Sequence, residues 1–142
     1  MHLCSPKTNT EFEQYFELRW RILRKPWNQP PGSEQDAEEG SAYHLMAIEN
    51  DKVIGVARLQ FTNSNSAQLR YMAVDNNYQK QGIGRSIVEH METYAMQHKA
   101  NELFLNARDN ALIFYKKLGY EITEKSYLLF NSIQHYKMRK NL

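Results

Sequence analysis

The feature that most constrains the fold is a two-glycine loop, Gln79-Lys80-Gln81-Gly82-Ile83-Gly84. A strand-like run at 69–74 precedes it, and an amphipathic helical pattern begins near Arg85. A tight turn at a helix N-terminus exposes backbone N–H groups, which form an anion site together with the helix dipole. Because glycine has no Cβ, a phosphate can approach this backbone closely. The loop therefore predicts a site for a ligand that carries a pyrophosphate.

Several kinds of loop fit two glycines before a helix. A Walker loop needs Lys-Ser or Lys-Thr after its last glycine, and neither follows here. The dinucleotide fingerprint needs a third glycine at the position where this chain has Ile87. In dinucleotide-binding folds, the glycine turn also follows the strand more closely than the loop does here. The pattern Q/R-x-x-G-x-G/A is matched by Gln79, Gly82 and Gly84, and resembles the coenzyme A pyrophosphate loop of GNAT N-acetyltransferases. A loop that only caps a helix is the remaining alternative.

Composition limits the class of protein. The 142 residues, 42% apolar and 24% charged, are typical of one globular domain spanning residues 1–142. A net charge of +2, from 18 basic and 16 acidic residues, is too balanced to favour a nucleic-acid partner. No apolar run approaches the ~18 residues of a membrane span, and no signal peptide is visible. With Cys4 as the single cysteine, we expect a cytoplasmic protein without a disulfide or a membrane partner.

Hydrophobic periodicity predicts the order of the elements. We expect a helix at 10–23, strands at 44–49, 53–61 and 67–74 with a polar hairpin loop at 62–66, a helix after the glycine loop, a strand at 102–106, a helix from Asp109 to Leu118, and strands at 127–130 and 135–139. Thr10 and Glu13 fit a capping box for the first helix, which Lys25-Pro26 should end. This order predicts an α/β fold with a mixed sheet and helices on both faces.

A long loop is predicted between the first helix and the first strand, at 25–42. It contains prolines, glycines and four acidic residues: Glu34, Asp36, Glu38 and Glu39. A loop of this length inside a compact domain is usually functional or disordered. Trp27 favours a function, and a solvated acidic loop is the alternative.

The order of elements, with the glycine loop opening the central helix, resembles the GNAT fold. A second motif supports the resemblance, because residues 106–120 look like the family's later strand-turn-helix segment. Within it, Ala111, Phe114 and Tyr115 fit A-x-x-F-Y, and Lys117-Leu118-Gly119-Tyr120 fits K-x-G-[FY]. Two motifs in the right order are more specific than either alone. The resemblance implies a mostly antiparallel central sheet that is splayed at the cofactor site.

A narrower resemblance rests on three N-terminal segments, at 16–20, 23–26 and 29–36, together with His44, the run at 70–74 and Ile133-Gln134-His135. They look like the acetyltransferase-like half of bacterial proteins that fuse a GNAT domain to a hotdog thioesterase. The match covers about residues 10–140, and the chain ends where the thioesterase would begin. We therefore expect it to act without that partner in cis.

The family resemblance implies transfer of an acetyl or short acyl group from acetyl-CoA to an amine of a small-molecule or protein acceptor, by direct attack in a ternary complex and without a metal. It implies that the backbone of Met72, Ala73 and Val74 pairs with the pantetheine arm and polarises the thioester carbonyl. The pyrophosphate would be surrounded by Gln79, Lys80, Gln81, Gly82, Ile83, Gly84 and Arg85. Asn106 and Asn110 would bond the cofactor arm, with capping or turn formation as the alternative.

Tyr115 occupies the position of the family's general acid, and packing beside Phe114 is the alternative. The candidates for a base are Glu34, Asp36, His44 and His135, of which we select Glu34 and His44 as catalytic residues. A structural role for either histidine is the alternative, as is a water chain in place of any base. Glu34 and Asp36 would otherwise bind a cationic substrate or pair with Arg19, Arg24 or Lys25.

Two other functions compete with the enzyme. One is an acyl-CoA-binding module without turnover. The other is a partner of an acidic acyl carrier protein, which would meet a basic cluster of Arg19, Arg21, Arg24 and Lys25. Homodimers are common in the family, so the resemblance makes a homodimer possible, although nothing in the sequence itself indicates one. Neither the acceptor nor the acyl chain length is encoded in these motifs.

Overall fold

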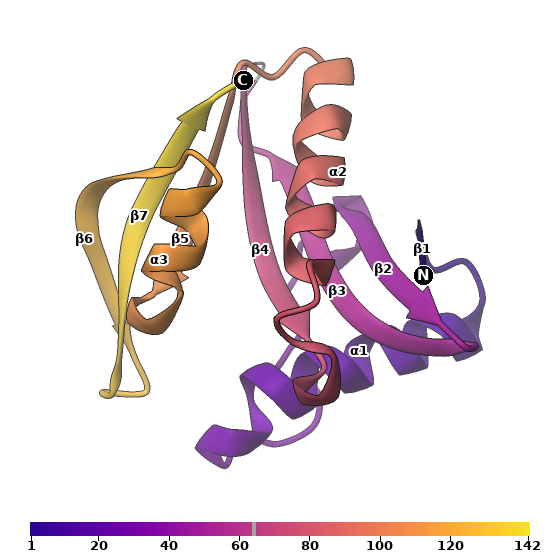
Figure 1. Ribbon diagram of the computed structural model, residues 1–142. Helices are drawn as coiled ribbons and strands as arrows, with labels where there is room; N and C mark the ends of the chain where they lie inside the picture. Colours follow the sequence, from indigo (N-terminus) through magenta and orange to yellow (C-terminus); the bar gives the residue numbers. More distant parts are fainter. Residues whose placement is uncertain (64) are drawn as a thin grey trace.

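The fold is a single twisted sheet with helices on both faces (Figure 1). The computed structural model describes residues 1–63 and 65–142. Its strands are β1 (His2–Cys4), β2 (Tyr43–Glu49), β3 (Lys52–Phe61), β4 (Ser66–Val74), β5 (Glu102–Arg108), β6 (Glu121–Leu129) and β7 (Ile133–Asn141). Its α-helices are α1 (Asn9–Leu23), α2 (Ile83–Gln97) and α3 (Leu112–Lys117), and its 3-10 turns are η1 (Lys25–Trp27), η2 (Glu39–Ser41), η3 (Asn76–Tyr78) and η4 (Asp109–Ala111).

The sheet order is β1-β2-β3-β4-β5-β7-β6. Every neighbouring pair is antiparallel except β4 and β5, which run parallel. The predicted mixed α/β architecture is therefore confirmed, and β1 is an additional edge strand. The predicted hairpin loop at 62–66 joins β3 to β4, and its residue 64 lies outside the described residues.

Two apolar layers sandwich the sheet, because successive strand residues point to opposite faces. Leu45 and Ala47 of β2 pack in the cluster that α2 and α3 cover, whereas Met46 packs in the cluster beneath α1. From α1, Tyr15 and Leu18 enter this second cluster. In Figure 1, α2 and α3 lie in front of the sheet and α1 behind it.

The N-cap of α1 lies two residues before the predicted one. Thr8 is the N-cap, and its Oγ1 accepts a hydrogen bond from the Glu11 backbone N–H at 3.1 Å. The Glu11 carboxylate in turn accepts from the Thr8 N–H at 2.9 Å, which completes a capping box. The predicted pair, Thr10 and Glu13, is wrong because the T-x-x-E pattern occurs twice in this segment.

The parallel pairing of β4 with β5 stops halfway along both strands. It runs from Ser66 opposite Glu102 to Leu69 opposite Leu105. Beyond that point β4 stays paired with β3 as far as Val74, and β5 stays paired with β7 as far as Arg108. The two halves of the sheet therefore diverge, as Figure 1 shows at the C-terminal ends of β4 and β5.

A bulge in β4 accompanies this divergence. The β3–β4 register shifts between Val56, opposite Ala73, and Arg58, opposite Arg70, which places one extra residue in β4. Within this stretch Tyr71 has a φ of 53°, in the left-handed region that non-glycine residues rarely adopt. A bulge bends its strand and redirects side chains, and so separates β4 from β5.

Guanidinium groups surround the Tyr71 ring. The central carbons of four arginine side chains lie within 6 Å of the ring centroid: Arg19 at 4.4 Å, Arg58 at 4.8 Å, Arg70 at 4.9 Å and Arg24 at 5.7 Å. Both Arg19 and Arg58 are fully buried. Charges buried in this way need carboxylate partners, since an unpaired buried charge is strongly destabilising.

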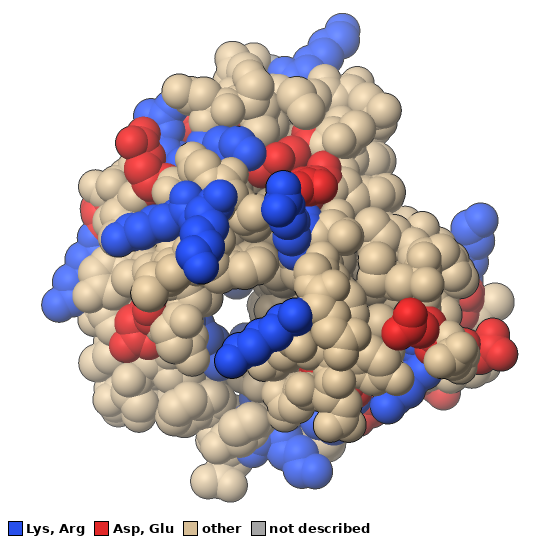
Figure 2. All heavy atoms as spheres, viewed as in Figure 1, with Lys and Arg blue, Asp and Glu red and all other residues tan. Residues whose placement is uncertain are grey.

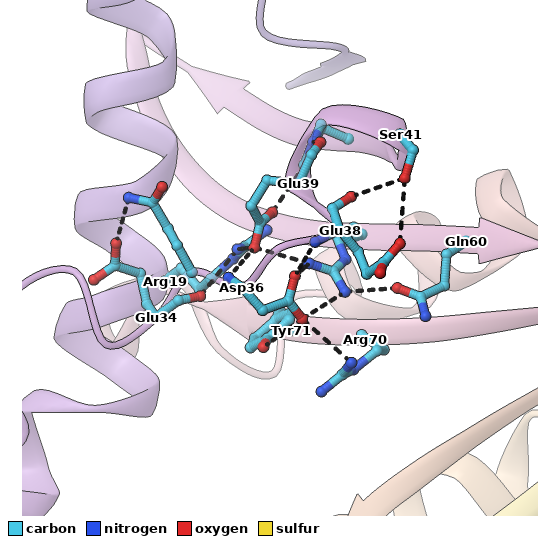
Figure 3. A network of polar contacts seen from close by, with 12 residues as sticks. Arg19, Glu34, Asp36, Glu38, Glu39, Ser41, Gln60, Arg70 and Tyr71 are labelled. Atoms are coloured by element: carbon cyan, nitrogen blue, oxygen red, sulfur yellow. Dashed lines mark hydrogen bonds and ion pairs between the residues drawn. The ribbon is translucent and has the colours of Figure 1, made fainter.

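The segment 25–42 supplies those partners (Figure 3). The Asp36 carboxylate accepts from Arg58 Nη1 and Nη2 at 2.6 and 3.0 Å, and from the Tyr71 hydroxyl at 3.2 Å. The Glu39 carboxylate accepts from Arg58 at 2.8 Å and from Arg19 at 2.9 Å. The acidic residues therefore fix this segment against the sheet, with Arg58 as a partner that the sequence analysis did not consider.

Asp36→Asn is expected to lower the free energy of unfolding by about 2 kcal/mol, because Arg58 loses a charged acceptor. Hydrogen bonds from Arg58 hold the pKa of Asp36 well below its usual range. The stabilisation is therefore complete above the unfolded pKa of about 4 and is lost as the pH falls further toward the folded pKa. Urea denaturation at pH 7 and below pH 4 measures both effects.

Glu38→Gln is the matched control, because Glu38 is exposed and its carboxylate contacts the Ser41 hydroxyl at 3.4 Å. It should leave stability and its acid dependence unchanged. Equal stability of the Asp36 and Glu38 variants would contradict the proposed importance of the Asp36–Arg58 pair.

Gly82→Ala is expected to destabilise the protein by about 1 kcal/mol. Gly82 precedes α2 with a φ of 83°, and an added Cβ would meet no atom within 4 Å, so backbone strain alone is tested. Gly40→Ala is the control, since its Cβ would also enter open space but its φ is not positive. Thermal or urea unfolding should show a loss for Gly82→Ala and no loss for Gly40→Ala.

Candidate functional site

The glycine loop forms an uncapped helix N-terminus. Gln79 folds back on the turn, donating from Nε2 to the Val74 carbonyl at 3.2 Å and to Asn76 Oδ1 at 3.1 Å. Lys80 and Gly82 both have left-handed backbone conformations, and α2 has no side-chain cap at Gly82. The first N–H groups of α2 are therefore available to an anion, and the helix dipole favours one there.

Gly84 brings this N-terminus against β4 and α3. A Cβ at Gly84 would lie 3.0 Å from Met72 Cε and 3.1 Å from Phe114 Cζ. Such close packing leaves little room for a side chain at position 84, in the first turn of α2. The loop, the divergent end of β4 and the start of α3 consequently share one region of the molecule.

The divergent end of β4 presents an open strand edge. Ala73 and Val74 pair with β3 on one side, whereas β5 has left β4 on the other side after Leu69. An open edge of backbone N–H and C=O groups can pair with an extended amide chain. Met72, Ala73 and Val74 lie at this open end of β4, and their pairing with a pantetheine arm stays a prediction.

A pocket of about 150 Å³ lies where β4 and β5 separate. It is lined by residues of four regions: Leu23 and Arg24 after α1, Gln68, Arg70, Tyr71 and Met72 of β4, Asn106, Ala107, Arg108, Ala111 and Tyr115 around β5 and α3, and Tyr127, Leu129 and His135 of β6 and β7. Figure 2 shows the surface hollowed between β4 and the lobe formed by β5, β6 and β7. Because its lining includes residues near α1 and residues near α3, the pocket connects the two faces of the sheet.

Tyr115 places a hydroxyl in this pocket. Its side chain is buried, and the hydroxyl donates to Met72 Sδ at 3.7 Å. Burial raises the pKa of Tyr115, so the phenol keeps its proton at neutral pH. Its ring also packs edge-on to Phe114 at 4.9 Å, so the packing role considered for this residue coexists with its place in the pocket.

His135 lines the same pocket in a defined tautomer. Its Nδ1 lies 3.0 Å from the Ile133 carbonyl oxygen, which can only accept, so Nδ1 carries the proton and Nε2 the lone pair. Burial lowers the pKa of His135, with the positive charges of Arg108 and Arg24 acting in the same direction. The Tyr127 ring stacks on the imidazole at 4.3 Å. This neutral histidine has the protonation state of a proton acceptor.

Glu34 and His44, the two bases selected from the sequence, do not line the pocket. The Glu34 carboxylate accepts from the Gly32 N–H at 2.7 Å and from Gln35 Nε2 at 2.8 Å. His44 has Nδ1 at 2.9 Å from the Tyr15 hydroxyl and Nε2 at 2.7 Å from the Glu39 carbonyl. Both side chains are thus engaged in holding segment 25–42 away from the pocket, and a catalytic role for either stays a prediction.

The other predicted residues are divided between the loop and the pocket. Arg85 is exposed and pairs with Glu89 at 2.7 Å, one turn along α2. Gln81 contacts the Asn77 carbonyl at 3.5 Å. Asn106 lines the pocket, and Asn110 is exposed in η4. Lys80 and Arg85 therefore flank the anion site without being fixed in it.

Arg24 and Arg108 are pocket residues whose role the sequence analysis missed. Arg24 Nη1 and Arg108 Nη2 each donate to the Leu23 carbonyl at 3.1 Å. Arg108 lies in the motif segment 106–120 but at none of the positions that the motif specifies, and it is far from Leu23 in the sequence, so no local pattern could pair them. The sequence pattern instead predicts Arg24 as part of a surface cluster for a carrier protein.

That basic cluster does not form a continuous free surface. Arg19 is fully buried and bonded to Glu39. Arg21 pairs with Glu17 at 3.0 Å and with Asp75 at 3.3 Å. Lys25 alone remains exposed outside the pocket, which weakens the carrier-protein hypothesis.

Two further searches cover residues 1–63 and 65–142. None of the helices there is both long and apolar enough to cross a membrane. In the same residues, no group of three or more His, Cys, Asp or Glu side chains is arranged to hold a metal ion.

Comparisons with known proteins agree with this geometry. Residues 27–142 match the model of the acetyltransferase (GNAT) domain family. YjcF of Bacillus subtilis strain 168, an uncharacterized N-acetyltransferase, is 27% identical over 135 residues, which cover 95% of this chain and 96% of the relative.

Solved structures show the same fold. An acyl-CoA N-acyltransferase from Pseudomonas aeruginosa superposes with a TM-score of 0.83 at 20% identity, covering 98% of this chain and 97% of that one. A GNAT family acetyltransferase from Elizabethkingia anophelis, solved with acetyl-CoA bound, gives 0.76 at 16% identity, covering 99% and 96%. The uncapped α2 loop, the diverging strands and the match over most of the sequence lead to one conclusion: the chain belongs to the GNAT acetyltransferase family.

Proposed function

We propose that the protein is an acetyl-CoA-dependent N-acetyltransferase, which moves an acetyl or short acyl group to an amine by direct attack in a ternary complex. The observation that carries the proposal is the meeting of the Tyr115 hydroxyl with Met72 where β4 leaves β5. The α2 N-terminus would bind the pyrophosphate, and the open edge of β4 would pair with the pantetheine amides. The acetyl-CoA bound to the Elizabethkingia anophelis relative supports the same donor here.

The pocket residues supply the proton transfers. As the amine nitrogen bonds to the thioester carbonyl carbon, it loses a proton, which His135 Nε2 would accept. As the C–S bond breaks, the sulfur gains a proton, which the Tyr115 phenol in the pocket would donate, and the proton taken up by His135 would return to the phenolate through solvent. Negative charge on the carbonyl oxygen would be stabilised by a backbone N–H of the open β4 edge.

Tyr115→Phe is expected to lower kcat about 100-fold, because the sulfur would leave without a proton donor. Acetyl-CoA affinity should change little, since the binding loop is untouched. Thiol release with an amine panel measures turnover, and calorimetry measures affinity. Tyr94→Phe is the matched control, because Tyr94 stacks on Tyr43 and is not among the residues that line the pocket. Unchanged kcat in Tyr115→Phe at every pH would remove this residue from the mechanism.

His135→Gln is expected to lower kcat/KM by about 100-fold and to flatten its acid limb. In the wild type, kcat/KM should fall as the pH drops through the pKa of His135, which burial places below 6.5, because the protonated ring cannot accept a proton. The charged groups facing the imidazole are Arg108 of β5, Arg24 after α1 and Asp109 of η4. An acid limb that survives in His135→Gln would show that another group titrates.

A binding module without turnover remains the second reading of the same loop and strand edge. It would bind acetyl-CoA but release no free CoA with any amine. The proton donor and acceptor in the pocket favour the enzyme, because binding alone requires neither.

A further inference from the structure

The part of the pocket next to α1 is strongly basic. Its lining includes three guanidinium groups, those of Arg24, Arg70 and Arg108, and among the described residues that line it none is an acid. This is the reverse of what a cationic acceptor would require, since like charges repel across a desolvated pocket. The acids of segment 25–42 do not alter this balance at Arg24 and Arg108, because Asp36 and Glu39 are engaged by Arg19, Arg58 and Arg70.

Arg24 and Arg108 differ from the third arginine in their partners. Arg70 lies 3.4 Å from the Asp36 carboxylate. In residues 1–63 and 65–142, no carboxylate lies within ion-pair distance of Arg24 or Arg108, and both donate instead to the neutral Leu23 carbonyl. Burial lowers the pKa of Arg108, and the charge of Arg24 lowers it further. Two partly buried like charges that share one neutral acceptor are incompletely compensated.

Within the described part of the chain, these two side chains have donors without a partner. Arg108 donates from Nη2 to Leu23, and Arg24 donates from Nε and Nη1 to Ser33 and Leu23. A guanidinium has several N–H groups in a planar fork that matches the two oxygens of a carboxylate or phosphate. Because Arg24 and Arg108 converge on one carbonyl oxygen, a single oxyanion can contact both.

The position of this pair relates it to the reaction. Arg108 of β5 is the register partner of His135 of β7, so its backbone lies beside that of the proton acceptor. Tyr115 lines the same pocket from α3. A volume of about 150 Å³ is small compared with the roughly 300 Å³ or more of typical ligand pockets, which favours a small acceptor.

We propose that the acceptor is a small amine that also carries an oxyanion, a carboxylate or a phosphate, which Arg24 and Arg108 bind while the amine lies at His135. This inference rests on the proposed acetyl transfer and names the acceptor class for that same site. The oxyanion selects the substrate and fixes the amine at a set distance from the anchor. It also adds negative charge near His135, which counteracts the two arginines and makes the imidazole a stronger base.

The first experiment compares amines in matched pairs, with acetyl-CoA as donor. Each amino acid is paired with its carboxamide, and O-phosphoethanolamine is paired with ethanolamine, so each pair differs in the oxyanion. Spermidine serves as a polycation. We expect kcat/KM to be at least about tenfold higher for the preferred oxyanion amine than for its neutral partner. The pair with the larger ratio identifies carboxylate or phosphate as the anchor.

Arg108→Gln should reduce that ratio by about tenfold, mainly through KM, because the anchor is lost while Tyr115 and His135 remain. Arg108→Lys keeps the charge without the fork and should retain part of the preference. Arg139→Gln is the matched control, since it removes a guanidinium from β7 that pairs with Glu102 outside the pocket. Circular dichroism confirms that each variant is folded.

Calorimetry with N-acetylglycine and N-acetylglycinamide, and with the N-acetyl derivatives of O-phosphoethanolamine and ethanolamine, tests the anchor without turnover. Selective binding of an oxyanion product that Arg108→Gln abolishes supports the anchor, even if acetyl-CoA fails to bind and the proposed function falls. If neutral amines or spermidine are acetylated as well as the oxyanion amines, the acceptor class is overturned while acetyl transfer stands. The acceptor class is likewise overturned, and acetyl transfer still stands, if Arg108→Gln leaves the preference for oxyanion amines intact.

Discussion

The packing of guanidinium groups around Tyr71 is the interaction on which the rest of the structure depends. Arg19 and Arg58 are fully buried against this ring, and they require the carboxylates of Asp36 and Glu39. One cluster therefore joins α1, the long segment 25–42 and the bulge of β4. The left-handed backbone of Tyr71 is costly by itself, and such a conformation persists only where its surroundings determine it.

Several functional features follow from that bulge. When β4 leaves β5, it exposes a strand edge and opens a pocket that connects the two faces of the sheet. The face covered by α2 and α3 contributes a helix N-terminus and the Tyr115 hydroxyl. The face covered by α1 contributes Arg24, close to Arg108. In the proposed acetyl transfer, the acyl donor and the amine would enter this pocket from opposite faces of the sheet.

Acidic residues of segment 25–42 bind buried arginines, although the composition of the segment suggests a loop that binds a cation. Its acids lie near the pocket and resemble a cation-binding loop in the sequence, yet Asp36 and Glu39 are neutralised by buried arginines. Arg58 is the deciding partner, and it lies within an apolar strand where sequence patterns give no sign of its role. The capping box is another case, because two overlapping T-x-x-E patterns are equivalent until the packing of α1 selects Thr8.

The sequence by itself determined the mixed α/β architecture, the helix after Gly82 and the family, because periodicity and glycine spacing are local properties of the chain. It also singled out Tyr115 through the motif in which that residue stands. The tertiary structure alone decided which titratable groups share the pocket. His135, Arg24 and Arg108 meet there because β5 pairs with β7 and because Arg108 contacts the end of α1 at Leu23. Glu34 and His44 instead form hydrogen bonds within segment 25–42 and with Tyr15. Contacts between residues far apart in the chain depend on the whole fold, and no local spacing encodes them.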